Sequence, residues 1–401
     1  MANRTQITLL SLPIIALTAC VQQVNPIWQT YFSTSDNNNN IEWLNDLTLD
    51  NFNDLLLTGS NITTGADRNE DALLAKYDQQ GNLIWATKYD LPASTIESTS
   101  SDEKLIESVI DLDGSIYSVG QRIEKIEGTS AKSSFVMKVD QDGNYLWATK
   151  ISDSHDAFDL EIANNSIYVT GYATQRLSLA GEVELVINHD DRAWDVEVDA
   201  LGNIYVASKH AVEQYNAEGD LGWQVKHSST ELSYRVNIEL DESNDSLVLL
   251  QADANSRFQL QSYSTQGELN WNQSINLTAD QNIAGIPALI VEDDSIWFAV
   301  SNGSQTKVGR VSNQGNTQWT FSEQQGPIRD LGKLANGNIV ITGAGHSVLL
   351  DSQGKQLGKN DSERSGSYTS GSLVVDGNKM FVATSVSAST GISIHLAMFE
   401  Q

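Results

Sequence analysis

The sequence predicts an all-β chain folded as a closed β-propeller of eight four-stranded blades, with seven blades as the alternative. A short motif returns along nearly the whole chain, in which a tryptophan follows a glycine by four residues, as in Gly81 and Trp85. Repetition of one motif every few tens of residues is typical of repeat architectures. Alternating apolar residues with Asp/Asn-Gly bends precede each motif and predict β-hairpins. The repeats therefore favour blades built from antiparallel strands.

The strands of one repeat can be assigned in order. Residues 108–120 alternate apolar and polar positions on both sides of a glycine bend, which predicts the first two strands. Residues 135–140 predict a third strand, which leads into the glycine–tryptophan motif and a fourth strand. Two copies are degenerate, with Leu185 and Gly358 at the tryptophan place. Counting these two copies, the five intact motifs and Trp28 gives eight repeats.

The two ends of the chain complement one another. Residues 25–31 resemble a fourth strand that has lost its preceding strands, and residues 395–400 resemble a third strand without its successor. Pairing them would close the ring with strands from both termini and remove its last free sheet edges. We therefore assign residues 26–401 to a single β-propeller domain.

The first twenty residues predict export and lipid anchoring. Residues 1–19 combine one positive charge, an apolar run and small residues before Cys20, which is the pattern of a signal peptide. The segment 17–20, Leu-Thr-Ala-Cys, resembles the bacterial lipobox. That resemblance implies that Cys20, the only cysteine, carries fatty acyl chains such as palmitate, with residues 20–25 as the lipidated anchor and linker. Val21 in place of aspartate implies the outer membrane of a Gram-negative cell, with the domain facing the periplasm or the surface.

The charge balance restricts the partners. The chain carries 52 Asp and Glu against 24 Lys and Arg, for a formal net charge of −28. Such a surface repels nucleic acid, and it also opposes adhesion to anionic lipid beyond the acyl anchor. Basic protein surfaces, cations and neutral glycans are the compatible partners. We expect a monomer or a member of a hetero-complex.

The recurring tryptophans are interpreted as structural anchors between blades. A tryptophan in this place packs its ring against a neighbouring sheet while its indole N–H finds a main-chain acceptor. The six anchors are Trp28, Trp85, Trp147, Trp223, Trp271 and Trp319.

These motifs support a family resemblance. The pattern Asp-x-x-Gly-Asn-x-x-Trp, present at residues 78–85 and 140–147, resembles the PQQ-type repeats of the quinoprotein-like propeller superfamily. That group includes quinoprotein alcohol dehydrogenases and the propeller lipoprotein of the outer-membrane barrel-assembly machinery. The resemblance implies a propeller that acts as a binding scaffold. A PQQ cofactor is not expected, because many quinone-dependent members need a vicinal disulfide that one cysteine cannot form.

The sequence predicts no catalytic residue. Its six histidines show no zinc-site spacing, and His155 and His189, each followed by aspartate, are interpreted as solvated loop residues. The expected function is a non-catalytic scaffold for an envelope protein. The alternative is a glycan-binding propeller, or one that cleaves glycans with paired carboxylates. Tyr172, Tyr234 and Tyr368 are the candidate glycan-stacking residues.

One set of carboxylates aligns across the repeats. Each lies near the start of a first strand, so that the set would meet at one mouth of the central channel, with Arg235 at the equivalent place in the fifth blade. These groups can accept main-chain hydrogen bonds, gather a Ca²⁺-type cation, or form a socket for a basic partner. No other cofactor is expected. The set comprises Asp46, Glu107, Asp159, Asp195 and Asp330.

Overall fold

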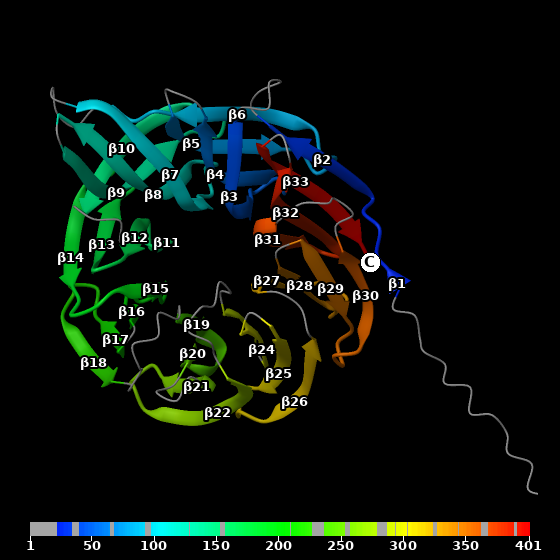
Figure 1. The fold of residues 1–401 in the computed structure, drawn as a ribbon. Helices are drawn as coiled ribbons and strands as arrows, with labels where there is room; N and C mark the ends of the chain where they lie inside the picture. The colour runs from blue at the N-terminus through cyan, green and yellow to red at the C-terminus, as the bar shows by residue number, and fades with distance from the viewer. Residues whose placement is uncertain are drawn as a thin grey trace, which may run out of the picture.

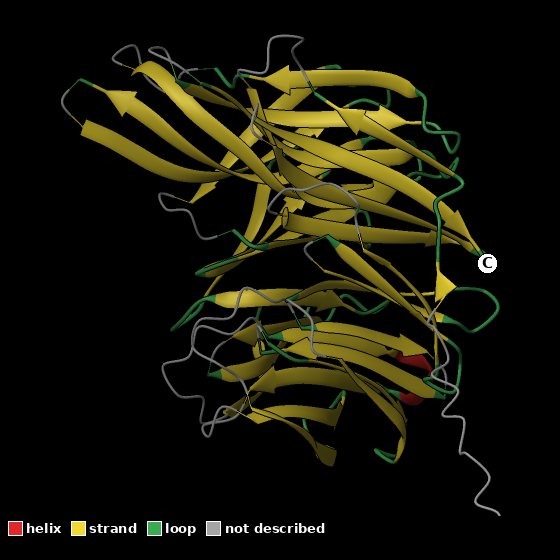
Figure 2. Cartoon of the chain, turned by 45° about the vertical axis from the view of Figure 1, so that its right-hand side comes forward, coloured by secondary structure: helices red, strands yellow, loops and turns green. Residues whose placement is uncertain are grey.

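A computed structural model shows a chain made of β-strands arranged as a ring (Figure 1). One short 3₁₀ helix, η1 (Glu242–Asn244), is the only helical element of the described residues (Figure 2). Within this described part, no helix is long and apolar enough to cross a membrane. The structure describes residues 22–33, 40–64, 68–92, 98–127, 129–152, 157–208, 210–226, 236–252, 257–278, 287–292, 294–302, 304–323, 327–343, 345–361, 368–388 and 391–401.

Most described strands form groups of four that are consecutive in the chain and hydrogen-bonded in order, and we call each group a blade. Blade 1 contains β3 (Asn40–Leu49), β4 (Leu55–Thr63), β5 (Asn69–Tyr77) and β6 (Leu83–Tyr89). Blade 2 contains β7 (Ser98–Ile110), β8 (Ile116–Ile126), β9 (Thr129–Val139) and β10 (Tyr145–Ser152). Blade 3 contains β11 (Asp159–Ala163), β12 (Ser166–Thr170), β13 (Ala173–Ser178) and β14 (Val183–Asn188). Blade 4 contains β15 (Ala193–Val198), β16 (Ile204–Ser208), β17 (Ala211–Tyr215) and β18 (Leu221–Lys226).

The next three blades repeat this arrangement. Blade 5 contains β19 (Asn237–Asp241), β20 (Ser246–Ala252), β21 (Arg257–Ser264) and β22 (Leu269–Thr278). Blade 6 contains β23 (Ala288–Glu292), β24 (Ser295–Ser301), β25 (Thr306–Ser312) and β26 (Thr317–Glu323). Blade 7 contains β27 (Ile328–Lys333), β28 (Ile339–Gly343), β29 (His346–Leu350) and β30 (Gln356–Asp361).

The eighth group takes strands from both ends of the chain. Its first three strands are β31 (Tyr368–Asp376), β32 (Lys379–Ala388) and β33 (Gly391–Glu400), and the fourth is β2 (Trp28–Phe32). β2 pairs antiparallel with β33, so that Trp28 lies opposite Met398. The first strand, β31, contacts both β27 of blade 7 and β3 of blade 1. The described strands thus form eight groups of four around the ring, and blue β2 lies beside red β33 in Figure 1.

The two ends of the ring differ in their connections. Because each blade is an antiparallel meander, the turns after its first and third strands lie at one end, and the connections after its second and fourth strands lie at the other. We call these ends the turn face and the loop face. The turn face includes turns 50–54, 111–115, 163–166, 199–203, 334–338 and 376–379 after first strands, and 78–82, 140–144, 178–182, 216–220, 264–268, 312–316 and 351–355 after third strands.

The apolar core is divided among the interfaces between blades. Between blades 5 and 6, for example, Leu250 and Phe258 pack against Phe298 and Val300, all of them buried. Similar buried clusters lie between other neighbouring blades. Each sheet therefore buries both of its faces, and only its inner and outer edges and its ends meet solvent.

The recurring tryptophans lie at these interfaces, on the fourth strands. A Cβ added to Gly315 of blade 6 would come within 2.7 Å of the Trp271 ring of blade 5, so the ring covers the glycine closely. Trp271 Nε1 also donates to the Asn313 carbonyl oxygen in the same turn, at 2.8 Å. The turn glycines have positive φ, which glycine adopts without strain. The same contact with the next turn glycine is made by Trp28 (Gly81), Trp85 (Gly143), Trp147 (Gly181), Trp223 (Gly267) and Trp319 (Gly354).

The degenerate copies differ in structure. Leu185 of blade 3 lies against Gly219 of blade 4, as a tryptophan would. Gly358 of blade 7 has no such turn to cover, because the fourth strand of blade 8 is β2, from the other end of the chain. Strand β1 (Gln22–Gln23) pairs parallel with β30 at Gly358 instead. The predicted linker 20–25 therefore contributes to the propeller from Gln22 onward.

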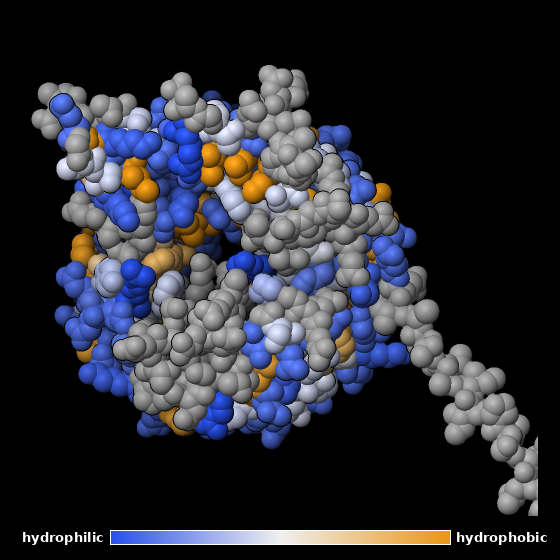
Figure 3. All heavy atoms as spheres, in the orientation of Figure 1, coloured by the Kyte–Doolittle hydropathy of each residue, from blue (hydrophilic) through white to orange (hydrophobic). Residues whose placement is uncertain are grey.

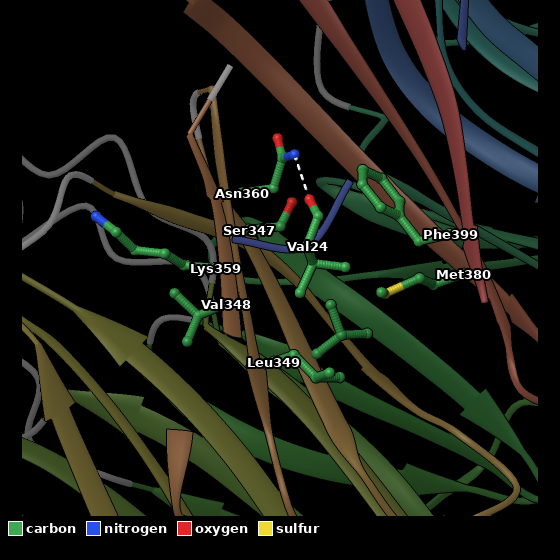
Figure 4. Close-up of a pocket in the computed structure, with 9 residues that line it drawn as sticks. Val24, Ser347, Val348, Leu349, Lys359, Asn360, Met380 and Phe399 are labelled. Carbon is green, nitrogen blue, oxygen red and sulfur yellow. Dashed lines mark hydrogen bonds between the residues drawn. The ribbon is translucent and has the colours of Figure 1, made fainter. Parts of the chain in front are cut away.

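The segment after β1 packs between blades 7 and 8. Val24 lies against Leu349, Met380 and Phe399 around a small cavity of about 10 Å³ (Figure 4). The Asn360 side chain donates to the Val24 carbonyl oxygen at 2.7 Å. A valine from the N-terminal segment thus provides apolar contact at an interface that lacks the tryptophan.

We expect Trp271→Ala to lower the free energy of unfolding by ~3–5 kcal/mol, because it removes a large ring from an interface between blades. Gly315→Ala should also destabilise, since its Cβ would clash with that ring and its φ of 81° disfavours a side chain. Denaturant unfolding of the two single variants and the double variant measures both effects.

The double variant provides the control for this contact. Without the indole ring the clash at position 315 disappears. The loss of unfolding free energy in the double variant should therefore be smaller than the sum of the losses in the two single variants. Strictly additive losses would show that Trp271 and Gly315 do not act on one another.

Candidate functional site

The aligned carboxylates occupy equivalent places on the first strands, which line the centre of the ring. Figure 3 shows the molecule hollowed near this centre, within a largely hydrophilic surface. Four of the five carboxylates directly follow an irregular position in the pairing of the first two strands, and the fifth, Asp159, begins β11. We call this set the channel carboxylates: Asp46, Glu107, Asp159, Asp195 and Asp330.

Each channel carboxylate bonds to the first strand of the following blade. Asp159 Oδ2 accepts the Val196 N–H at 2.9 Å. Asp195 accepts the Ile238 N–H at 2.9 Å, and Asp330 accepts the Leu373 N–H at 2.9 Å. Asp46 accepts the Ser108 N–H at 3.3 Å, and Glu107 bonds to the Leu160 backbone in the same way.

These hydrogen bonds have a structural reason. The first strand of a blade is an edge strand, and the N–H groups on its free edge, beside the channel, have no strand partner. Buried main-chain donors need an acceptor, and a carboxylate from the preceding blade provides one. The same contact joins neighbouring blades around the channel.

Other residues stand at the equivalent place in the remaining blades. In blade 5 that residue is Asn237, whose side chain donates to Asp195 at 2.8 Å. In blade 8 it is Ser372, whose hydroxyl donates to Asp330 at 3.2 Å. In blade 6 the strand register puts Ala288 there. Arg235, the residue that the sequence alignment put in blade 5, lies outside the described residues; strand pairing assigns the place to Asn237 instead.

A second layer of acids lies two residues further along the first strands, toward the turn face, and the sequence reasoning missed it. Glu161, Glu197 and Glu239 each follow the first layer by two residues, so they share its side of the strand. Glu161 bonds to the Val198 backbone, and Glu197 to the Leu240 backbone. The signal was present as an acid or amide followed by a glutamate two residues later in three successive repeats.

Burial changes the protonation of both layers. Burial is the main cause that raises the pKa of Asp330 to about 6, of Glu239 to about 7 and of Glu161 to about 8. Burial and the neighbouring Glu239 raise the pKa of Glu197 to about 10. Burial and Asp159 likewise hold the pKa of Glu107 well above its ordinary value. Much of the channel is therefore uncharged near neutral pH.

Three carboxyl groups of the first layer are bonded directly to one another. Glu107 bonds to Asp159, and Asp159 bonds to Asp195, through their side chains. Two carboxyl groups can share a hydrogen bond only if one of them keeps its proton. Their contact is also closer than the separations of roughly 5–9.5 Å that glycosidase carboxylates use. Among the described residues, no group of three His, Cys, Asp or Glu side chains is arranged to hold a metal ion.

One sequence interpretation is wrong. His189 was expected to be a solvated loop residue, but its side chain is only 1% exposed. Its Nδ1 lies 3.2 Å from Glu213 Oε2 in the next blade, and its Nε2 lies 2.8 Å from Thr174 Oγ1. The ring is thus a buried link between blades 3 and 4. His155 lies outside the described residues.

Aromatic residues gather beside the channel carboxylates of blades 3 and 4. The rings of Phe158 and Trp194 are in contact, with centroids 4.4 Å apart and planes tilted by 35°. The Arg192 guanidinium lies over Phe158 and also over Tyr172, at 5.3 Å from the centre of the latter ring. Tyr172 is 46% exposed and borders a cavity of about 280 Å³ with Thr170. Cys20, Tyr234 and the side chain of Tyr368 lie outside the part that the structure describes.

No family model matches the chain. A curated relative is the uncharacterized WD repeat-containing protein L264 of Acanthamoeba polyphaga mimivirus, 25% identical over 202 residues. The match covers 45% of this chain and only 14% of the viral protein.

Solved structures resemble the chain over most of its length. The Dos1 propeller gives a TM-score of 0.61 at 10% identity, with 93% of this chain and 95% of that one covered. BamB from Moraxella catarrhalis gives a TM-score of 0.56 at 11% identity, with 93% and 99% covered. At such identities the likeness concerns the fold alone, and it shows a β-propeller.

The raised carboxyl pKa values predict a stability that falls as pH rises. The unfolded chain loses these protons near pH 4, whereas the folded chain keeps them to a pH between about 6 and 10. Between these limits the folded state binds more protons, so the free energy of unfolding decreases with increasing pH. We expect Glu197→Gln to flatten this dependence and to raise stability at pH 8 by ~1–3 kcal/mol. Urea unfolding from pH 5 to pH 9 measures it.

Glu218→Gln is the matched control, since Glu218 is an exposed acid in a turn of the same blade. It should leave the pH profile as in the unmodified protein. A profile that is flat in the unmodified protein would contradict the burial of protons in the channel.

Proposed function

We propose that this chain is a closed, eight-bladed propeller lipoprotein that acts as a non-catalytic binding scaffold for a protein partner in the bacterial envelope. Acyl chains on Cys20 would hold it at the outer membrane of a Gram-negative cell. The observation that carries the proposal is the propeller fold, shared over 93% of the chain with solved propellers that include BamB.

The channel geometry supports a binding role over a catalytic one. The carboxylates that could serve as acid and base already accept main-chain hydrogen bonds from the next blade, as Asp195 does from Ile238. Those that touch one another are too close for a glycosidic bond and a water to fit between them. Their described contacts therefore account for their presence without a reaction.

The position of the N-terminal strand supports a short tether. Gln22, two residues after Cys20, is already paired with Gly358 of blade 7. Two or three acyl chains on Cys20 would anchor the protein stably, at ~0.8 kcal/mol for each inserted CH₂. The domain would then lie directly against the membrane, with no long linker.

The charge of the chain selects the partner. With a net charge of −28, the surface attracts a basic protein and speeds its association at low ionic strength. The proposal includes no PQQ cofactor. Whether a divalent cation takes part in binding is tested by adding a chelator to the capture experiment described below.

A glycan-binding propeller is the second candidate. Tyr172, Arg192 and the Phe158–Trp194 pair favour it, because sugar rings stack on exposed aromatic faces beside polar groups. Tyr172→Ala should abolish retention on any glycan that the unmodified protein binds on an array. Retention that survives this substitution would exclude the Tyr172 cluster.

The primary test is affinity capture with the purified protein from detergent-solubilised envelopes, with and without a chelator. We expect one stoichiometric, basic protein partner. Loss of that partner under chelation would add a cation to the proposal. A capture without a stoichiometric partner contradicts the scaffold and leaves the glycan candidate.

The anchor is tested separately. Cys20→Ser should abolish incorporation of labelled palmitate and release the protein from the membrane fraction, because the only thiol that can be acylated is lost. Ala2→Ser, a change far from the lipobox-like segment, is the control. Labelling that persists in Cys20→Ser contradicts lipidation.

A further inference from the structure

Three large apolar side chains protrude from the turn face. Phe52, Leu112 and Leu201 are 73%, 90% and 84% exposed, and they include the most exposed large apolar residues of the described chain. Each stands at the tip of the turn between the first and second strands, in blades 1, 2 and 4. The turns of other blades carry small or polar residues at their tips, such as Ala335, Asn336 and Gly377.

Turn chemistry does not require these residues. Tight turns favour Asp, Asn, Gly and Ser, which hydrogen-bond locally or tolerate positive φ. Asp50 already provides such bonds in the first turn, accepting the Phe52 N–H at 2.8 Å and the Asp54 N–H at 2.9 Å. A polar residue at position 52 would keep both contacts. The apolar side chain is therefore an addition that the fold does not use.

The tips belong to the turns of four successive blades. The Asn51 side chain of blade 1 donates to the Asp111 carbonyl oxygen of blade 2 at 3.0 Å, so the turns of Phe52 and Leu112 adjoin. The Asn164 side chain of blade 3 donates to the Asp199 carbonyl oxygen at 2.9 Å, which ties it to the turn of Leu201. Four successive blades thus present three apolar tips.

Ionised carboxylates flank these tips. Hydrogen bonds from Ser115 lower the pKa of Asp113, next to Leu112. Hydrogen bonds from Asn144 likewise lower the pKa of Asp140, in the outer turn of the same blade. These acids stay charged at neutral pH, in contrast to the buried acids of the channel.

Cations close to the tips of blades 1 and 2 are already engaged. Lys76 is paired with Asp50 at 2.6 Å, and its own side chain is mostly buried. Lys138 lies over the Tyr117 ring, with its Nζ 4.7 Å from the ring centre. The surface around the tips is therefore negative overall, with apolar projections.

We propose that Phe52, Leu112 and Leu201 form the docking surface for the scaffold's partner, and that the partner offers a basic segment with interleaved apolar side chains. This inference rests on the proposed function and names its surface and the partner chemistry. Exposed apolar groups that the fold does not need mark interaction sites, and the flanking charges select a cationic counterpart. An anionic bilayer or a nucleic acid would be repelled by the same aspartates.

The test uses the purified full chain and a synthetic peptide of alternating leucine and lysine as the probe. Phe52→Ser, Leu112→Ser and Leu201→Ser are combined in one turn-face variant. We expect this variant to bind the peptide about tenfold more weakly, because apolar anchors dominate such contacts. A peptide of alternating serine and lysine should bind the unmodified chain and the variant equally. Because the three residues are exposed, thermal unfolding should be unchanged.

A second triple variant is the matched control. Leu83→Ser, Leu221→Ser and Leu269→Ser remove three exposed leucines from the first positions of fourth strands, at the outer rim rather than in the turns between first and second strands. This variant should keep the affinity of the unmodified chain. Equal loss in both variants, or no loss in the turn-face variant, overturns the proposal.

Two further arms separate the alternatives. Phosphatidylcholine vesicles should not bind the chain; binding that the turn-face variant loses would make the tips a membrane contact and overturn the protein docking surface. In envelope capture, a partner retained by the turn-face variant would leave the scaffold standing and reject this surface. A capture that fails already with the unmodified chain rejects the scaffold itself.

Discussion

Every sheet in this ring has an inner edge whose main-chain groups lack a strand partner, and the structure depends on how that edge is satisfied. In five of the eight blades the donor is met by a carboxylate from the preceding blade, as where Asp159 accepts the Val196 N–H. The bond has a consequence for charge. Burying carboxyl groups around a narrow channel raises their pKa, so several keep their protons, and Glu107, Asp159 and Asp195 can then bond to one another.

The rim of the ring follows a different rule. A ring from one blade covers the turn glycine of the next, and the indole N–H bonds inside that turn, as Trp271 does with Asn313. Neighbouring blades such as 1 and 2 are thereby joined at both their inner and their outer strands. Leu185 takes the place of the tryptophan between blades 3 and 4. The interface after blade 7 lacks this contact, because the fourth strand of blade 8 comes from the N-terminus. There Gly358 replaces the tryptophan, and β1 and Val24 pack in its place.

The acids of this chain fall into two populations with different roles. Those in the channel are buried, several of them with pKa values raised well above their ordinary values, and they join blades. Those in the turns, such as Asp113, are exposed and ionised. The negative electrostatic field that attracts a partner therefore comes from the acids of the turns and the outer surface, and not from the channel acids that the sequence alignment identified. This division supports a binding surface on the turn face and a structural role for the channel.

Sequence alone determined the architecture, because the repeat and the alternation of apolar residues are local patterns that specify strands and turns directly. It also identified the six tryptophans, the first carboxylate layer and the complementary chain ends, since these recur at fixed places in each copy. Tertiary structure decided what the carboxylates touch, that Asn237 takes the blade 5 place, and that His189 is buried against Glu213. It also showed Phe52, Leu112 and Leu201 exposed on the same face of the ring. Each of these depends on which blades are neighbours and how deeply a side chain is buried, and no single repeat encodes either quantity.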